Sequence, residues 1–189
     1  MTYLTYPPTM PDFNLMQRVK RDLYAMRNGA IADRLRRLGS PHLIIFGLNL
    51  PQLAEIATRY AGDPALAEEL WANTSTRESM LLAPMIYPIE GMTMETALRW
   101  IGTIPSTEVA DILCHRLLRK LDFAPDLIDT LARSTRDLDR YAALRLTFNL
   151  LPSRPDVARA LAETEMSSGT PLTASICRAL IDEVDFLME

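Results

Sequence analysis

The chain has 189 residues, 48% of them hydrophobic, and a formal net charge of −4 at pH 7. This length suits one domain with a substantial core, and no apolar run approaches the roughly 18 residues of a membrane span. The N-terminus has neither a basic start nor a long apolar run, so we expect no signal peptide. The two cysteines, Cys114 and Cys177, lie in apolar helical patterns, which favour reduced thiols in a cytoplasmic protein. Dinucleotide-binding, P-loop, serine-hydrolase and Cys-x-x-Cys motifs are missing from the sequence, so we expect no small-molecule cofactor.

The negative charge is concentrated at the C-terminal end. Residues 160–189 carry six acidic side chains and one arginine, Arg178, which gives −5 and leaves +1 for residues 1–159. Arginine also dominates the cations, with lysine only at Lys20 and Lys120. Because a guanidinium donates two hydrogen bonds to one phosphate, this part of the chain remains compatible with nucleic acid binding. Genomic base composition is the alternative explanation for the excess of arginine.

The first predicted elements are two helices, over 12–26 and 29–38, separated at Arg27-Asn28-Gly29. The apolar stretch 42–46 is the one segment with a strand-like alternation. A further helix is predicted to begin at Pro51, because proline is favoured in the first turn of a helix.

The rest of the chain is predicted to form helix pairs, at 63–72 with 75–87, 93–102 with 106–121, 125–133 with 137–151, and 155–166 with 170–187. The pairs open about thirty residues apart, at Asp63-Pro64, Thr93-Met94, Pro125-Asp126 and Pro155-Asp156. Asp and Thr cap helix starts by accepting backbone N–H bonds. We therefore predict an all-α fold of compact HEAT-like repeats stacked as an α-solenoid, whose second helices line a concave face. We expect a single domain over 1–189, with 1–11 as an N-terminal tail; a non-repetitive helical globule is the alternative.

The second helix of the 93–121 pair carries the strongest candidate for chemistry. Ser106 is predicted to cap it, and a buried apolar stripe follows at helical spacing. Asp111 falls outside that stripe and shares a face with Thr107 and His115, four residues away on either side. An exposed carboxylate without a role, paired with His115, is the alternative. A metal site is not expected, because the only other histidine is His42.

A set of arginines on the second helices is the second candidate. Its members are Arg77, Arg116, Arg119, Arg140 and Arg145, with Arg133 and Arg136 in a corner. Such a stripe would follow the phosphates of a duplex. A solvated face is the alternative for any single arginine, because acidic residues lie next to several of them.

Three segments, in this order, resemble the DNA alkylation repair glycosylases of the AlkD type. They are Met26-Arg27-Asn28-Gly29, Leu53-Ala54-Glu55-Ile56-Ala57 and the hairpin from Leu70-Trp71 to Arg77-Glu78. The resemblance extends over about Met26 to Leu118. It implies a fold of HEAT-like repeats, duplex DNA as the partner, and hydrolysis of the N-glycosidic bond of N3- or N7-alkylated purines.

The resemblance also assigns roles to residues. Asp111 matches the catalytic Asp of the family, whose carboxylate stabilises the positive charge that develops on the sugar. Thr107 stands where the family has a Trp that packs against the sugar, and Arg145 stands near a second aromatic position. Together with the arginine set on the second helices, the candidate DNA-binding residues are Arg77, Thr107, His115, Arg116, Arg140 and Arg145. The rival interpretation is a non-enzymatic HEAT-like scaffold that binds a protein or structured DNA.

Overall fold

A computed structural model of the chain describes residues 14–188, and these form helices joined by short loops. The predicted tail over 1–11 lies outside the described residues. The α-helices are α1 (Leu15–Ala25), α2 (Gly29–Arg37), α3 (Leu50–Thr58), α4 (Pro64–Ala72), α5 (Arg77–Ile86), α6 (Met94–Ile101), α7 (Thr107–Arg116), α8 (Ala124–Leu131), α9 (Asp137–Asn149), α10 (Pro155–Ser168) and α11 (Pro171–Met188). Three short 3₁₀ turns, η1 to η3, occupy Ile89–Gly91, Leu118–Lys120 and Leu151–Ser153.

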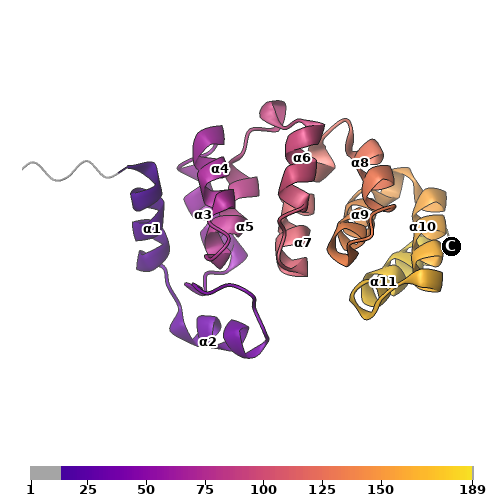
Figure 1. Cartoon of the computed structure of the whole chain (residues 1–189), viewed down its shortest axis with the longest axis horizontal. Coiled ribbons are helices and arrows are strands. Elements are labelled where there is room, and N and C mark those ends of the chain that lie inside the picture. The colour runs from indigo at the N-terminus through magenta and orange to yellow at the C-terminus, as the bar shows by residue number, and fades with distance from the viewer. Residues whose placement is uncertain (1–13, 189) are drawn as a thin grey trace, which may run out of the picture.

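The helices stand in a curved row of two layers (Figure 1). Helices α4, α6, α8 and α10 form the outer, convex layer, and α3, α5, α7, α9 and α11 form the inner one. Each inner helix from α5 onward packs on the next inner helix along the row. The predicted all-α solenoid, with second helices on the concave side, is therefore confirmed.

Helix starts agree with the capping residues of the sequence. Asp63 accepts a hydrogen bond from the backbone of Leu66 at 2.9 Å, and Thr93 accepts one from Thr96 at 3.1 Å. The Ser106 side chain likewise caps α7. The second helix of that pair is shorter than predicted: α7 ends at Arg116, and a 3₁₀ turn replaces its expected last turn.

The first helix pair differs from the prediction. Helix α2 buries only Ala32 among its nine residues and stands apart from the two layers (Figure 1). Helix α1 packs instead on α3 and α4, so α3 takes the inner position that α2 was expected to occupy. The physical reason is that α2 is mainly polar and ends in Arg34, Arg36 and Arg37, which leaves it almost no apolar face to bury.

The strand-like stretch forms no sheet. Ile44 makes one isolated parallel bridge with Thr76 at the start of α5. The loop is held by the buried Glu78 carboxylate, which accepts hydrogen bonds from the backbone N–H groups of Phe46, Gly47 and Leu48. Gly47 has φ +81°, and a Cβ there would lie 2.2 Å from the carbonyl oxygen of Asn28. The apolar alternation therefore marks a docked loop and not a paired strand.

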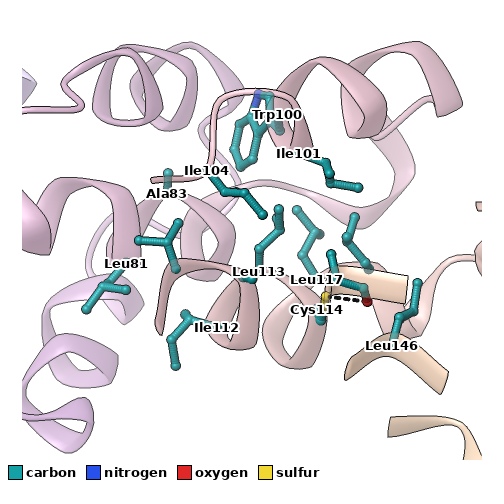
Figure 2. Packing of buried hydrophobic residues seen from close by; sticks show 14 of the residues in the cluster. Leu81, Ala83, Trp100, Ile101, Ile104, Ile112, Leu113, Cys114, Leu117 and Leu146 are labelled. Carbon is teal, nitrogen blue, oxygen red and sulfur yellow. Dashed lines mark hydrogen bonds between the residues drawn. The ribbon is translucent and has the colours of Figure 1, made fainter. Parts of the chain in front are cut away.

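Interleaved side chains of successive repeats form the core. Figure 2 shows Trp100, Ile104 and Leu113 packed together, with the Cys114 thiol directed at the Ala142 carbonyl oxygen 3.6 Å away. The rings of Trp71 and Trp100 stack with centroids 4.3 Å apart, and both residues are buried. Both tryptophans therefore belong to the core between repeats.

Candidate functional site

Asp111 lies at the centre of a polar cluster on the inner layer. Its Oδ1 accepts a hydrogen bond from the Tyr141 hydroxyl at 2.9 Å and one from Arg145 Nε at 2.6 Å. Arg145 Nη2 also donates to the Tyr141 hydroxyl at 3.2 Å, which closes a triangle between α7 and α9. Three groups that hold one another in this way have well-defined positions before any ligand arrives.

The cluster opens onto a hollow of about 360 Å³ in the concave face. Helix α7 contributes Glu108, Asp111 and His115 to its lining, and Arg145 and Asn149 come from α9. The Asp111 side chain is 36% exposed, so its carboxylate is held by protein donors and is still open to a ligand. The face predicted from the four-residue spacing of Asp111 and His115 does look into this hollow.

The environment of the cluster shifts two of its pKa values. Burial raises the pKa of Tyr141 to about 12, so its hydroxyl keeps the proton that it donates to Asp111. Burial alone would lower the pKa of Arg145, but its hydrogen bond to Tyr141 and the charge of Asp111 raise it. The cluster thus contains a neutral donor and a permanent cation around one carboxylate.

Thr107 faces a neighbouring hollow of about 380 Å³. Tyr141, Arg145 and Phe148 line the same space, with Leu172 from α11 on its far side. Arg145 therefore separates the two hollows. Its guanidinium carbon lies 5.7 Å from the centre of the Phe148 ring, which gives the cation an aromatic neighbour as well as a carboxylate.

The structure places Arg77 in the interior, 6% exposed. It pairs with Glu78 at 2.8 Å and with Glu108 at 2.5 Å, and Nη1 donates to the Leu48 carbonyl oxygen. Burial lowers the pKa of Arg77, but bonding to Glu108 and the charges of both carboxylates raise it overall. Its charge joins the docked loop to α5 and α7 and is directed at protein carboxylates.

Arg140 is also engaged by the protein. Its Nε lies 3.1 Å from Glu165 Oε2, its Nη2 lies 2.7 Å from Asp137, and the side chain is 16% exposed. It links α9 to α10, where sequence reasoning expected a cation facing a ligand. The DNA-binding roles of Arg77 and Arg140 stay predictions, and both side chains would have to leave their carboxylates to contact a phosphate.

His115 and Arg116 lie at the C-terminal end of α7. The His115 pKa is lowered by burial first and then by the charge of Arg119. Arg116 is half-buried, and its Nε is buried without a hydrogen-bond partner in the described part of the chain. Arg145 borders the hollow beside Asp111, and Arg116 borders a third hollow at the ends of α5 and α7.

Sequence reasoning missed Tyr141 as a part of this site and did not predict that Glu108 would pair with Arg77. Tyr141 follows Asp111 by 30 residues and Glu108 follows Arg77 by 31, so both pairs join equivalent turns of adjacent repeats. The repeat period itself was the signal that could have identified them. Within residues 14–188 no group of three His, Cys, Asp or Glu side chains is arranged to hold a metal ion.

Chemically, the arrangement offers an oriented carboxylate beside a cation at the wall of an open hollow. Such a carboxylate can stabilise a positive charge that develops in a bound ligand. The neighbouring guanidinium has the planar geometry that binds phosphate.

Across the described residues, no helix combines the length and the apolar character that crossing a bilayer requires.

Comparisons with known proteins agree with this architecture. The family model described as "DNA alkylation repair enzyme" matches residues 19–189. A solved structure described as "a new family of proteins related to the HEAT-like repeat DNA glycosylases with affinity for branched DNA structures" superposes with a TM-score of 0.76 at 20% sequence identity. The match covers 86% of this chain and 72% of that one, and at this identity it shows the fold. None of the curated proteins compared with the chain matches it.

Proposed function

This chain belongs to the DNA alkylation repair enzyme family, and on that premise we propose that its concave face binds duplex or branched DNA around Asp111 and Arg145. The observation that carries the proposal is the cluster in which Tyr141 and Arg145 hold Asp111 at the wall of an open hollow. A DNA strand lying in the concave face would place a phosphate against Arg145 and a sugar near the carboxylate. The protein would act in the cytoplasm, where the free thiols of Cys114 and Cys177 persist.

The affinity for branched DNA ascribed to the similar solved structure supports a preference for distorted DNA. A curved inner layer presents its binding groups along an arc, and a bent or branched duplex follows an arc with less deformation than a straight one. The concave faces of helical-repeat proteins serve as extended binding surfaces. We therefore infer that a three-way junction binds more tightly than a linear duplex of equal length.

Hydrolysis of the N-glycosidic bond of an alkylated purine is the second candidate function. It is favoured by the partial exposure of Asp111, whose carboxylate could stabilise a cationic sugar. Two features oppose strong activity. Arg145 neutralises the carboxylate at 2.6 Å, and Thr107 supplies no ring to pack against the sugar. DNA binding with weak base release is the combination that these contacts support best.

Binding of the purified protein to labelled linear duplex and three-way junction DNA, measured over a range of salt concentrations, tests the proposal. Arg145→Gln should weaken binding, while Arg99→Gln, which removes an exposed charge paired with Glu68 on the outer layer, should not. Base release from methylated duplex is measured in parallel. A wild-type protein with no affinity for either DNA at low salt would reject the proposal and favour a scaffold that binds protein.

A further inference from the structure

We propose that a third hollow, bordered by Arg116 and Lys120, holds a backbone phosphate of the DNA strand that passes Asp111. This inference rests on the proposed function and adds a contact point to it. The hollow has a volume of about 360 Å³ and lies where α3, the end of α5 and the end of α7 meet. No family match or solved structure described above assigns a ligand to it.

This third hollow and the hollow beside Asp111 lie along the same helices. Helix α3 contributes Leu50 to the hollow beside Asp111, and Ala54 and Ala57 to the third hollow. Helix α7 contributes Asp111 to the former and Arg116 to the latter. Five residues of helix correspond to about 7.5 Å along the axis and to a rotation of about 140° around it. A strand that contacts both residues would therefore pass from the inner face of α7 toward its C-terminal end.

Arg116 is the residue that identifies the ligand class. Its Nε is buried with no hydrogen-bond partner, and no carboxylate among residues 14–188 forms an ion pair with the guanidinium. A buried donor without an acceptor loses its hydrogen bond to water and gains none in return, so such groups are normally satisfied. A phosphate oxygen is an acceptor that a guanidinium binds in two-pronged geometry. The ligand class that fits these donors is therefore an anion with several oxygens.

The surrounding charges agree with an anion site. Lys120 lines the hollow, and Arg119 lies next to it on the exposed side of the 3₁₀ turn. After burial, the charges of Arg119, Arg116 and Lys120 all lower the pKa of His115. Three cations thus act on one imidazole. Glu90 also borders the hollow, but it forms no ion pair with either cation of the lining in the described structure.

The alternative explanation is that Arg116 stabilises the C-terminal end of a helix. A cation in the last turn of α7 interacts favourably with the helix dipole. Hydrogen bonds from the guanidinium to the exposed carbonyl groups of that turn, or of α5, would complete such a role. The buried Nε donates to none of them. The dipole therefore accounts for a positive charge at this place but not for an unsatisfied buried donor.

The apolar part of the lining fits the rest of a nucleotide backbone. Pro84, Met85 and Ile86 at the end of α5 face Ala54 and Ala57 of α3 across the hollow. Deoxyribose presents carbon-rich faces next to each phosphate, and such faces lose little when they leave water for an apolar wall. The hollow thus offers cations on one side and an apolar wall on the other, as a sugar–phosphate unit requires.

The salt dependence of DNA binding tests this site. Each phosphate contact contributes about 0.9 to the slope of log K against log salt, so Arg116→Gln and Lys120→Gln should each lower the slope by about that amount. Relative to 1 M salt, the same relation makes each contact worth about eightfold in affinity at 0.1 M salt, and each variant should lose about that factor. Arg99→Gln is the matched control, since it removes one positive charge from the outer layer.

Thermal unfolding separates a binding role from a structural one. Arg116→Met keeps the apolar stem and removes the unsatisfied donor, so it should unfold at the wild-type temperature or above while DNA affinity falls. If wild type binds DNA, and Arg116→Gln and Lys120→Gln both bind with wild-type affinity and slope, the phosphate site is wrong although the proposed function stands. A lower unfolding temperature for Arg116→Met, with unchanged DNA affinity, would likewise assign Arg116 a structural role.

A failure of the proposed function has a different signature. If the wild-type protein binds neither linear nor branched DNA, titration with inorganic phosphate tests whether the hollow binds an anion. A saturable shift of the Arg116 Nε–H resonance, lost in Lys120→Gln, would retain the anion site for another phosphate-bearing ligand. An unchanged resonance up to high phosphate concentration would overturn it.

Discussion

Arg145 Nε lies 2.6 Å from Oδ1 of Asp111, and this ion pair joins α7 to α9 at the wall of the concave hollow. Both side chains are partly exposed, at 28% and 36%, so solvent screens the pair and a ligand can compete for either partner. A phosphate that binds Arg145 would release the carboxylate next to the adjoining sugar. The two residues are therefore expected to respond to DNA as a unit.

Replacing Asp111 by Asn should separate binding from chemistry. The substitution keeps the size of the side chain and frees Arg145 for a phosphate. We expect tighter binding at low salt, because no ion pair has to be broken before Arg145 binds the phosphate. Any base release from methylated duplex should fall about 10²-fold or more, a loss of roughly 3 kcal/mol of barrier stabilisation.

The matched control for this substitution is Asp126→Asn on the outer helix α8, which removes one exposed negative charge away from the concave face. Equal gains of DNA affinity in Asp111→Asn and Asp126→Asn would mean that only the net charge matters. Unchanged base release in Asp111→Asn would show that Asp111 is not the catalytic carboxylate.

Arg77 should contribute to stability more than any exposed arginine. Arg77→Met leaves Glu78 fully buried without its cation, and breaking a buried pair in this way costs about 3–5 kcal/mol. Arg99→Met breaks an exposed pair with Glu68 and should cost less than about 1 kcal/mol. Urea unfolding followed by circular dichroism measures both. Equal midpoints for the two variants would contradict the structural role of Arg77.

Local sequence signals predicted the repeats well because capping and helical periodicity act within a few residues. Asp63, Thr93 and Ser106 each accept the backbone hydrogen bond that marks a helix start. The same signals predicted that Asp111 would lie off the buried stripe, and it does border the hollow. Aromatic stacking of Trp71 on Trp100 in the core also agrees with their spacing near one repeat.

Those local signals could not predict the contacts between repeats. The sequence of α5 shows that Arg77 is charged, but its burial depends on Glu108, which lies one repeat later. Arg140 is likewise satisfied by Glu165 of α10. Helical periodicity identifies a face and leaves its partner unknown, so buried and exposed arginines look alike. The outward position of α2 has the same origin, because its helical pattern gave no information on where α3 would pack.

The pH dependence of the free energy of unfolding tests the environment of the Tyr141 hydroxyl. Its pKa is raised to about 12 in the folded protein, chiefly by burial, against about 10 in the unfolded chain. The folded state then binds the proton more tightly, so this stabilisation is complete below pH 10 and is lost as the pH rises through 12. The shift corresponds to roughly 2–3 kcal/mol. Tyr141→Phe lacks this dependence.

Denaturant unfolding of wild type and Tyr141→Phe between pH 9 and pH 12 makes the comparison. The difference in the free energy of unfolding between wild type and variant should shrink or change sign as the pH rises. Curves that stay parallel over this range would show that the Tyr141 proton is not held by the folded state. Tyr24, which is 57% exposed, gives the matched control Tyr24→Phe.

Thr107→Trp tests whether the site is a glycosylase site that lacks its aromatic. Thr107 lies about one helical turn before Asp111 and borders a hollow of about 380 Å³, large enough for an indole beside Arg145. A ring there would exclude water from the sugar and add dispersion contacts near the carboxylate. We expect base release from methylated duplex to increase over wild type, and the double variant Thr107→Trp with Asp111→Asn to lose that gain. Thr107→Val, which changes polarity without adding a ring, should release base at the wild-type rate. If Thr107→Trp binds DNA normally but releases no more base than Thr107→Val, Asp111 acts in this chain as a partner of Arg145 in DNA binding and not in hydrolysis.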